Sequence, residues 1–186
     1  AARVTTPIRT GAYALRLGLG DEVNVASTSA VRQRISLPAD ATAAMLSFYY
    51  YPDADANPGS DVWEVLLLDA GTNNVLATIL RTVPGGEGTW FWVTVDLLPY
   101  RGRTVDLYLA VVNDGAGGGS TVFVDDVSLR LCTPTGAPPT STATPPVYPP
   151  PTSTPIYPSP APGCPNLLQN PGFEQGAVSW FLGPTK

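Results

Sequence analysis

Short segments in which apolar residues alternate with other residues recur along the first 131 residues, and this two-residue period constrains the fold more than any other feature. Tyr13, Leu15 and Leu17, for example, alternate with Ala14 and Arg16. Because successive side chains of a strand point to opposite faces, each such segment predicts a strand with one buried face. Eight strands are predicted, over residues 13–17, 31–37, 45–51, 62–69, 75–83, 90–97, 105–112 and 121–131. No apolar repeat at three and four residues extends over a dozen positions, so we predict an all-β fold, a β-sandwich or jelly roll.

The same alternation assigns side chains to faces. On the strand 45–51, Phe48 and Tyr50 should point one way and Tyr49 and Tyr51 the other. On the last strand, strict alternation puts Asp125 on the face of Phe123, Val127 and Leu129. We therefore expect Asp125 to point inward, where a carboxylate needs a partner. Asp126, on the other face, is expected to be solvated.

Residues 133–163 have a composition unlike the rest of the chain. They consist mainly of Pro, Thr and Ser, with a few residues such as Tyr and Val, and contain no charged residue. Such a segment favours extended polyproline II, with a reach on the order of 90 Å. Its Ser and Thr residues beside prolines resemble those of O-glycosylated stalks, and an unmodified linker is the alternative. The chain is thus expected to comprise a body (1–132), a linker (133–163) and a tail (164–186).

Composition excludes several classes of function. The formal net charge of −5 argues against nucleic acid as a partner, because phosphate binding needs a basic face. No apolar run is long enough to insert into a membrane. Histidine is absent, which excludes imidazole-based catalysis and imidazole metal ligands. Carboxylate pairs such as Asp53 and Asp55 show no spacing that assigns one as acid and one as base, so we do not expect an enzyme.

The tail reads as the beginning of a domain, although it lies at the end of the chain. Residues 166–180 have the sequence NLLQNPGFEQGAVSW, a short apolar segment followed by a turn, an aromatic–acidic pair and a tryptophan. This sequence resembles the opening of a carbohydrate-binding, galactose-binding-like jelly-roll module. The later parts of such modules resemble GAYALRL at 11–17, AMLSFYY at 44–50, WFWVTVDL at 90–97 and VFVDDVSL at 122–129. All the pieces are present, but the opening piece comes last.

The resemblance implies that the tail supplies the first strand that the body lacks. Its apolar residues Leu167, Leu168, Phe173 and Trp180 should then be buried in the groove left by that strand. The tail could fold back onto its own body, or enter the next copy as a donor strand, which would build a head-to-tail homopolymeric filament. The extended linker favours the filament, and the main prediction is a structural protein whose partners are copies of itself. A fragment cut from tandem modules, after Lys186 and before Ala1, is a further alternative.

A carbohydrate-binding module of a secreted enzyme or cell-surface protein is the second functional prediction. Aromatic side chains that point outward can stack on sugar rings, and the candidates for contact with a sugar or a neighbouring subunit are Tyr49, Tyr51, Trp92 and Tyr108. Burial in the core or in an interface is the alternative for each of them.

Two further sites follow from the resemblance, because the first and last strands of such modules lie close together. It implies a disulfide between Cys132 and Cys164, which would suit an extracellular location, whereas two unpaired thiols are the alternative. It also implies a structural Ca²⁺ bound by Asp125 and Glu174, since calcium prefers carboxylate oxygens. The alternative is that Asp125 accepts hydrogen bonds from backbone amides.

Overall fold

The structure is a computed structural model that describes residues 1–19, 25–54, 59–85, 88–134, 164–176 and 178–182. These residues form an all-β sandwich of jelly-roll type, as predicted, with one 3₁₀ turn at Leu98–Tyr100. The strands are β1 (Ala2–Val4), β2 (Ala14–Gly18), β3 (Ser27–Ser36), β4 (Ala43–Ala54), β5 (Val62–Asp69), β6 (Val75–Thr82), β7 (Phe91–Asp96), β8 (Thr104–Asn113), β9 (Ser120–Cys132) and β10 (Phe181–Leu182).

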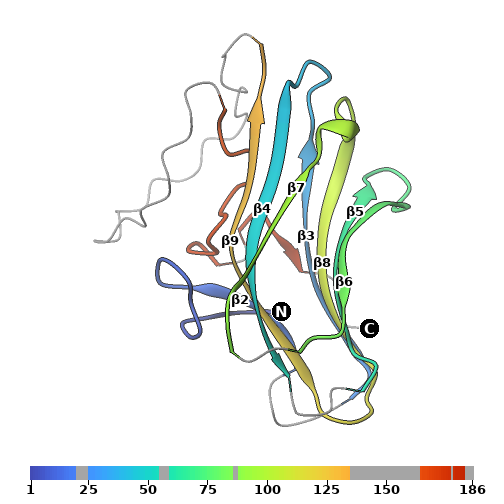
Figure 1. The fold of residues 1–186 in the computed structure, drawn as a ribbon, viewed down its shortest axis with the longest axis vertical. Helices are drawn as coiled ribbons and strands as arrows, with labels where there is room; N and C mark the ends of the chain where they lie inside the picture. The colour runs from blue at the N-terminus through green and yellow to red at the C-terminus, as the bar shows by residue number, and fades with distance from the viewer. Residues whose placement is uncertain (20–24, 55–58, 86–87, 135–163, 177, 183–186) are drawn as a thin grey trace.

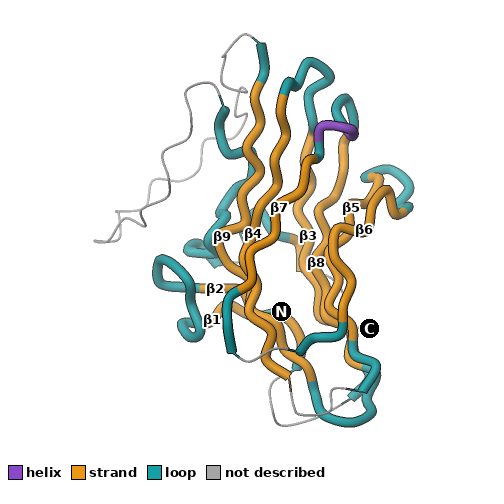
Figure 2. The backbone as a smooth tube through the Cα atoms, viewed as in Figure 1, coloured by secondary structure: helices purple, strands orange, loops and turns teal. Residues whose placement is uncertain are grey.

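Two antiparallel sheets face each other (Figures 1 and 2). Sheet A has the strand order β1-β2-β9-β4-β7, and sheet B has the order β10-β3-β8-β5-β6. The eight predicted strands correspond to β2 to β9. The two short strands β1 and β10, which the periodicity did not predict, lie at the edges of their sheets on the same side of the sandwich.

Alternating side chains from both sheets fill the space between them. The core includes Val31 and Ile35 from β3, Leu46 and Phe48 from β4, and Leu107 and Leu109 from β8. Fully buried Trp63 on β5 lies at its centre, and Tyr50 on β4 packs against it with ring centroids 6.0 Å apart. Burial of large apolar side chains is the main stabilising contribution to a fold of this kind.

The predicted direction of Asp125 is wrong, and a β-bulge is the reason. Ser47 on β4 lies opposite Ser128, and Tyr49 lies opposite Asp125, so β9 has one more residue than β4 between these pairs. The extra residue falls at Asp126, whose φ of 52° is in the left-handed region. A bulge reverses the alternation. Val124 and Val127 both join the core, whereas Asp125 points away from it.

Most of the predicted linker, residues 135–163, lies outside the described residues, as do Asp55 and the tail's last residues 183–186. Its extended conformation and its glycosylation therefore remain predictions. In the described part of the chain, no helix has the length and apolar character needed to cross a membrane.

Candidate functional site

The tail lies along the second half of β9, beyond the point where β2 stops. β2 pairs with residues 121–124 of β9, before the bulge. After the bulge, β9 pairs with the tail instead of β2. The amide of Leu167 donates to the carbonyl of Leu129 (2.7 Å), and the amide of Leu131 donates to the carbonyl of Pro165 (3.1 Å). The Asn166 side chain accepts from the Leu129 amide at 2.9 Å. The tail therefore extends sheet A along an edge that would otherwise be open.

From β9 the tail crosses to sheet B, where β10 pairs with β3 (Figure 1, in red). Gln33, a buried polar residue on the inward face of β3, holds this crossing. Its side-chain amide donates to the carbonyls of Gln169 (3.0 Å) and Ser179 (3.2 Å), and its side-chain oxygen accepts from the Gln169 amide (3.1 Å). The sequence analysis gave Gln33 no role; a glutamine that alternates with the apolar residues Val31 and Ile35 was the available signal.

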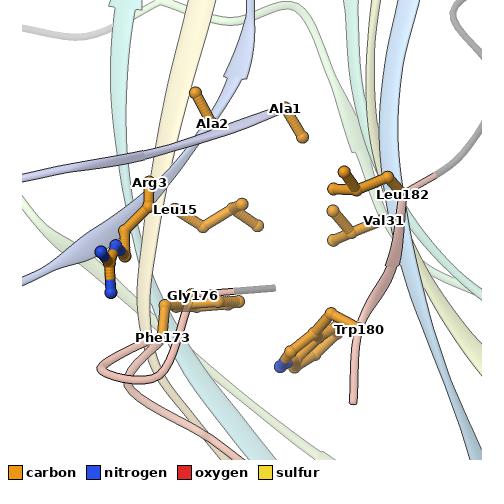
Figure 3. A pocket seen from close by; sticks show the side chains of 9 residues that line it. All are labelled: Ala1, Ala2, Arg3, Leu15, Val31, Phe173, Gly176, Trp180 and Leu182. Atoms are coloured by element: carbon orange, nitrogen blue, oxygen red, sulfur yellow. The ribbon is translucent and has the colours of Figure 1, made fainter. Parts of the chain in front are cut away.

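The apolar side chains of the tail belong to the core. Leu168, Phe173 and Trp180 are each at most 5% exposed, and Leu167 is half-buried. Figure 3 shows Phe173 and Trp180 pointing between the sheets, toward a cavity of about 160 Å³ that both ends of the described chain line. The tail thus contributes three buried side chains to the core of the sandwich.

A disulfide joins body and tail. The sulfur atoms of Cys132 and Cys164 lie 2.00 Å apart, and their Cα atoms 4.2 Å apart. The linker therefore leaves and re-enters the domain at one point.

The two carboxylates expected to bind calcium contact one loop, residues 9–13, which covers Asp125 on the outer face of sheet A. The Asp125 carboxylate is fully buried and accepts from the amides of Arg9 (2.9 Å) and Thr10 (3.2 Å). Glu174, from the tail, accepts from the amides of Ala12 (3.0 Å) and Tyr13 (3.3 Å). The loop is thereby anchored to both β9 and the tail.

These contacts do not favour a calcium ion. Both carboxylates accept hydrogen bonds from amide N–H groups, whose positive ends therefore point toward the carboxylate oxygens. Calcium, in contrast, requires six to eight oxygen ligands. Asp125 also accepts from the amide of Asp126 at 2.7 Å. Within the described ranges, no group of three or more His, Cys, Asp or Glu side chains is placed to hold a metal. The calcium ion stays a prediction, and the described geometry matches the alternative of a carboxylate bonded to backbone amides.

Burial also sets the ionisation of this site. Desolvation raises the pKa of the Asp125 carboxyl to about 6, the charge of Asp126 adds to the rise, and the amide donors oppose it. The prediction that Asp126 is solvated is wrong, because its carboxylate pairs with the Arg9 guanidinium at 2.5 Å. That guanidinium also lies over the Tyr49 ring, 3.4 Å from its centroid.

An aromatic patch lies on the outer face of sheet A. Its side chains come from β4, β7 and β9 and from Trp90, which directly precedes β7. Trp92, on edge strand β7, is 60% exposed and stacks on Tyr49 with centroids 6.4 Å apart. Tyr51 contacts Trp90 and Phe123 edge to face, at 5.5 and 6.0 Å. We use the name aromatic patch for these five residues.

Tyr108, the fourth predicted contact residue, is not part of the patch. It lies on β8, where Leu107 and Leu109 enter the core, so its ring is on the outer face of sheet B. Burial raises the pKa of the Tyr108 hydroxyl, and the charge of Glu64 adds to the rise. The structure therefore divides the four predicted aromatics between the two faces of the sandwich.

No protein-family model matches the chain, and no curated protein matches it. Among solved structures, the chain is similar to the carbohydrate-binding module TmCBM61, whose structure was solved in complex with β-1,4-galactotriose. The two are 17% identical, with a TM-score of 0.45 over 64% of this chain and 70% of that chain.

Proposed function

We propose that this chain is a carbohydrate-binding module and that the aromatic patch is its sugar platform. The observation that carries the proposal is Trp92, a large ring left 60% exposed at the edge of a sheet. Exposure of a tryptophan costs the free energy that its burial would contribute. A ligand that covers the ring recovers that contribution.

The ring is also held in place, as a platform requires. Tyr49 stacks on Trp92, and the Arg9 guanidinium also packs on the Tyr49 ring. Arg9 is in turn held by its ion pair with Asp126. A ring immobilised before binding loses less conformational entropy when a ligand stacks on it.

An extracellular location is part of the proposal. The Cys132–Cys164 disulfide supports it, because such bonds persist mainly in oxidising compartments. A carbohydrate-binding role outside the cell is consistent with that setting.

Affinity electrophoresis through gels containing neutral polysaccharides, β-1,4-galactan among them, tests the proposal. We expect at least one polysaccharide to retard the wild-type chain. Trp92→Ala should weaken that binding by about tenfold or more, equivalent to about 1.4 kcal/mol of lost aromatic contact. Met45→Ala is the matched control, because Met45 is also exposed on the outer face of β4 but lies outside the patch. Retardation that Trp92→Ala leaves unchanged would contradict the assigned platform, and no retardation by any polysaccharide would contradict the function.

Head-to-tail assembly, the main prediction from the sequence, is a second proposal. The only covalent links between the tail and its body are the linker and the disulfide bond. In an assembly, Leu168, Phe173 and Trp180 would make their core contacts with the body of a neighbouring copy. Exchange requires the closed form to open first, because a filled groove cannot accept a second tail.

A further inference from the structure

A cavity of about 240 Å³ lies on the outer face of sheet B, away from the aromatic patch, and is lined by Arg32, Arg34, Asp106 and Phe181. Three strands supply these residues, and one of the three is β10 of the tail. The cavity is therefore complete only when a tail is docked.

Charge in the cavity is unbalanced. Asp106 is 1% exposed, and the Arg34 guanidinium engages both of its oxygens, at 2.9 and 3.0 Å. Arg32 approaches the same carboxylate only to 3.7 Å, outside hydrogen-bond distance. Two guanidinium groups thus face one carboxylate, and the cavity carries one net positive charge.

Arg32 has donors to offer a ligand. In the described part of the chain its hydrogen-bond partner is the side-chain oxygen of Asn73, at 3.3 Å. A guanidinium has five N–H groups in a planar fork that matches a carboxylate. Its side chain is 43% exposed, so a ligand in the cavity can reach it.

Aromatic rings flank Arg32 on both sides. Phe181 on β10 and Tyr108 on β8 are its direct cross-strand partners, so the three side chains stand in a row on one face of the sheet. Phe181 is 63% exposed, although the tail buries its other large rings. An exposed apolar ring beside a guanidinium suits a ligand with an apolar face and an anionic group.

We infer that this cavity binds an acidic saccharide, with the carboxylate of a uronic acid unit on Arg32 and the sugar ring against Phe181. The inference rests on the proposed carbohydrate-binding function, but it uses the opposite face of the sandwich. The pair formed by Arg34 and Asp106 lines the same cavity, where Asp106 is buried and Arg34 is partly exposed to a ligand.

Titration calorimetry with a galacturonate trisaccharide and with its methyl ester tests this inference, because the ester keeps the sugar and removes the charge. We expect the acid to bind the wild-type chain about tenfold or more tightly than the ester, since a charge-assisted hydrogen bond is lost. Added sodium chloride should weaken the binding of the acid.

Arg32→Gln should remove the preference for the acid, whereas Arg81→Gln should keep it. Arg81 is the matched control because it is also an exposed arginine of sheet B paired with a carboxylate, that of Glu64. Phe181→Ala should weaken the binding of the acid and the binding of the ester by the same factor. Unchanged melting temperatures would show that the variants fold.

The outcomes separate this inference from the proposed function. Equal affinities for the acid and the ester, or a preference that survives Arg32→Gln, would overturn the inference. Trp92→Ala should leave binding of the acid unchanged, and loss of that binding would assign the acidic ligand to the aromatic patch instead. Neutral polysaccharide binding that depends on Trp92, together with no preference for the acid, would leave the proposed function standing without this second site.

Discussion

Asp126 adopts a left-handed backbone conformation, and this one residue determines where Asp125 points. The bulge turns Asp125 outward, beneath the loop at residues 9–13. The carboxylate is buried there all the same, because the loop covers it and supplies amide donors. Its environment combines a desolvation cost, which favours the neutral acid, with hydrogen bonds that favour the anion.

The first prediction concerns the pH dependence of stability through Asp125. Its pKa in the folded chain, about 6, lies above the ordinary aspartate value of 3.8. Between these values the folded state binds more protons than the unfolded state, so the free energy of unfolding contributed by this group falls as pH rises from about 4 to about 6. The full difference corresponds to about 3 kcal/mol.

Asp125→Asn removes this titration. Urea unfolding of both chains between pH 4 and pH 7.5 should show wild-type stability falling relative to the variant as pH rises. A constant difference across that range would contradict the raised pKa. The same series with added calcium chloride gives the control for the metal: a rise in the wild-type free energy of unfolding that Asp125→Asn abolishes would show that calcium, not the amides alone, satisfies the carboxylate.

At the scale of elements, the tail behaves as part of the sandwich core. Phe173 is 2% exposed and lies against Trp180, with ring centroids 5.2 Å apart. The same segment carries Val178, which is 56% exposed. The tail therefore contains both a core residue and an internal control.

The second prediction is that Phe173→Ala costs about 3–5 kcal/mol of unfolding free energy, as expected for a fully packed aromatic side chain. The left-handed backbone at Phe173, with φ of 58°, is equally strained for alanine, so the change reports the side chain. Val178→Ala should stay within about 0.5 kcal/mol of the wild type. Chemical denaturation measures both, and equal small effects would mean that the tail does not contribute to the cooperative fold.

The long strands of this fold could be predicted from the sequence, because each of them contains several repeats of the two-residue alternation. The sequence did not predict β1 and β10, which are three and two residues long and too short for a period to register. It placed Leu168, Phe173 and Trp180 in the groove on the strength of a resemblance, and these three are buried. It missed the bulge at Asp126, because no glycine marks the left-handed residue, and it missed the cavity at Arg32, because three distant strands assemble it.

At the scale of the whole molecule, covalent and non-covalent links hold the tail against both sheets of the body. The disulfide, the pairing of the tail with β9 and the contacts of Gln33 all hold the tail of the same chain. A tethered segment has an effective concentration on the order of millimolar at its own site. Self-closure should therefore outcompete exchange between chains at micromolar concentrations, unless a stiff linker prevents the tail from turning back.

The third prediction decides between closure and exchange. Chain oxidised at micromolar concentration should run as one monomer band on a non-reducing gel and elute as a monomer, because Cys132 pairs with Cys164 of the same chain. The chain is then unfolded with reductant, refolded and oxidised at about millimolar concentration. At that concentration the tails of neighbouring chains compete with the chain's own tail, whose effective concentration is also about millimolar. Head-to-tail exchange predicts a ladder of covalent multimers after this treatment that collapses on reduction, and a Cys164→Ser chain should form no ladder. A ladder in the untreated sample would contradict the closed form, whereas monomer under every condition would contradict the assembly proposal and leave a binding module that uses its tail as its own first strand.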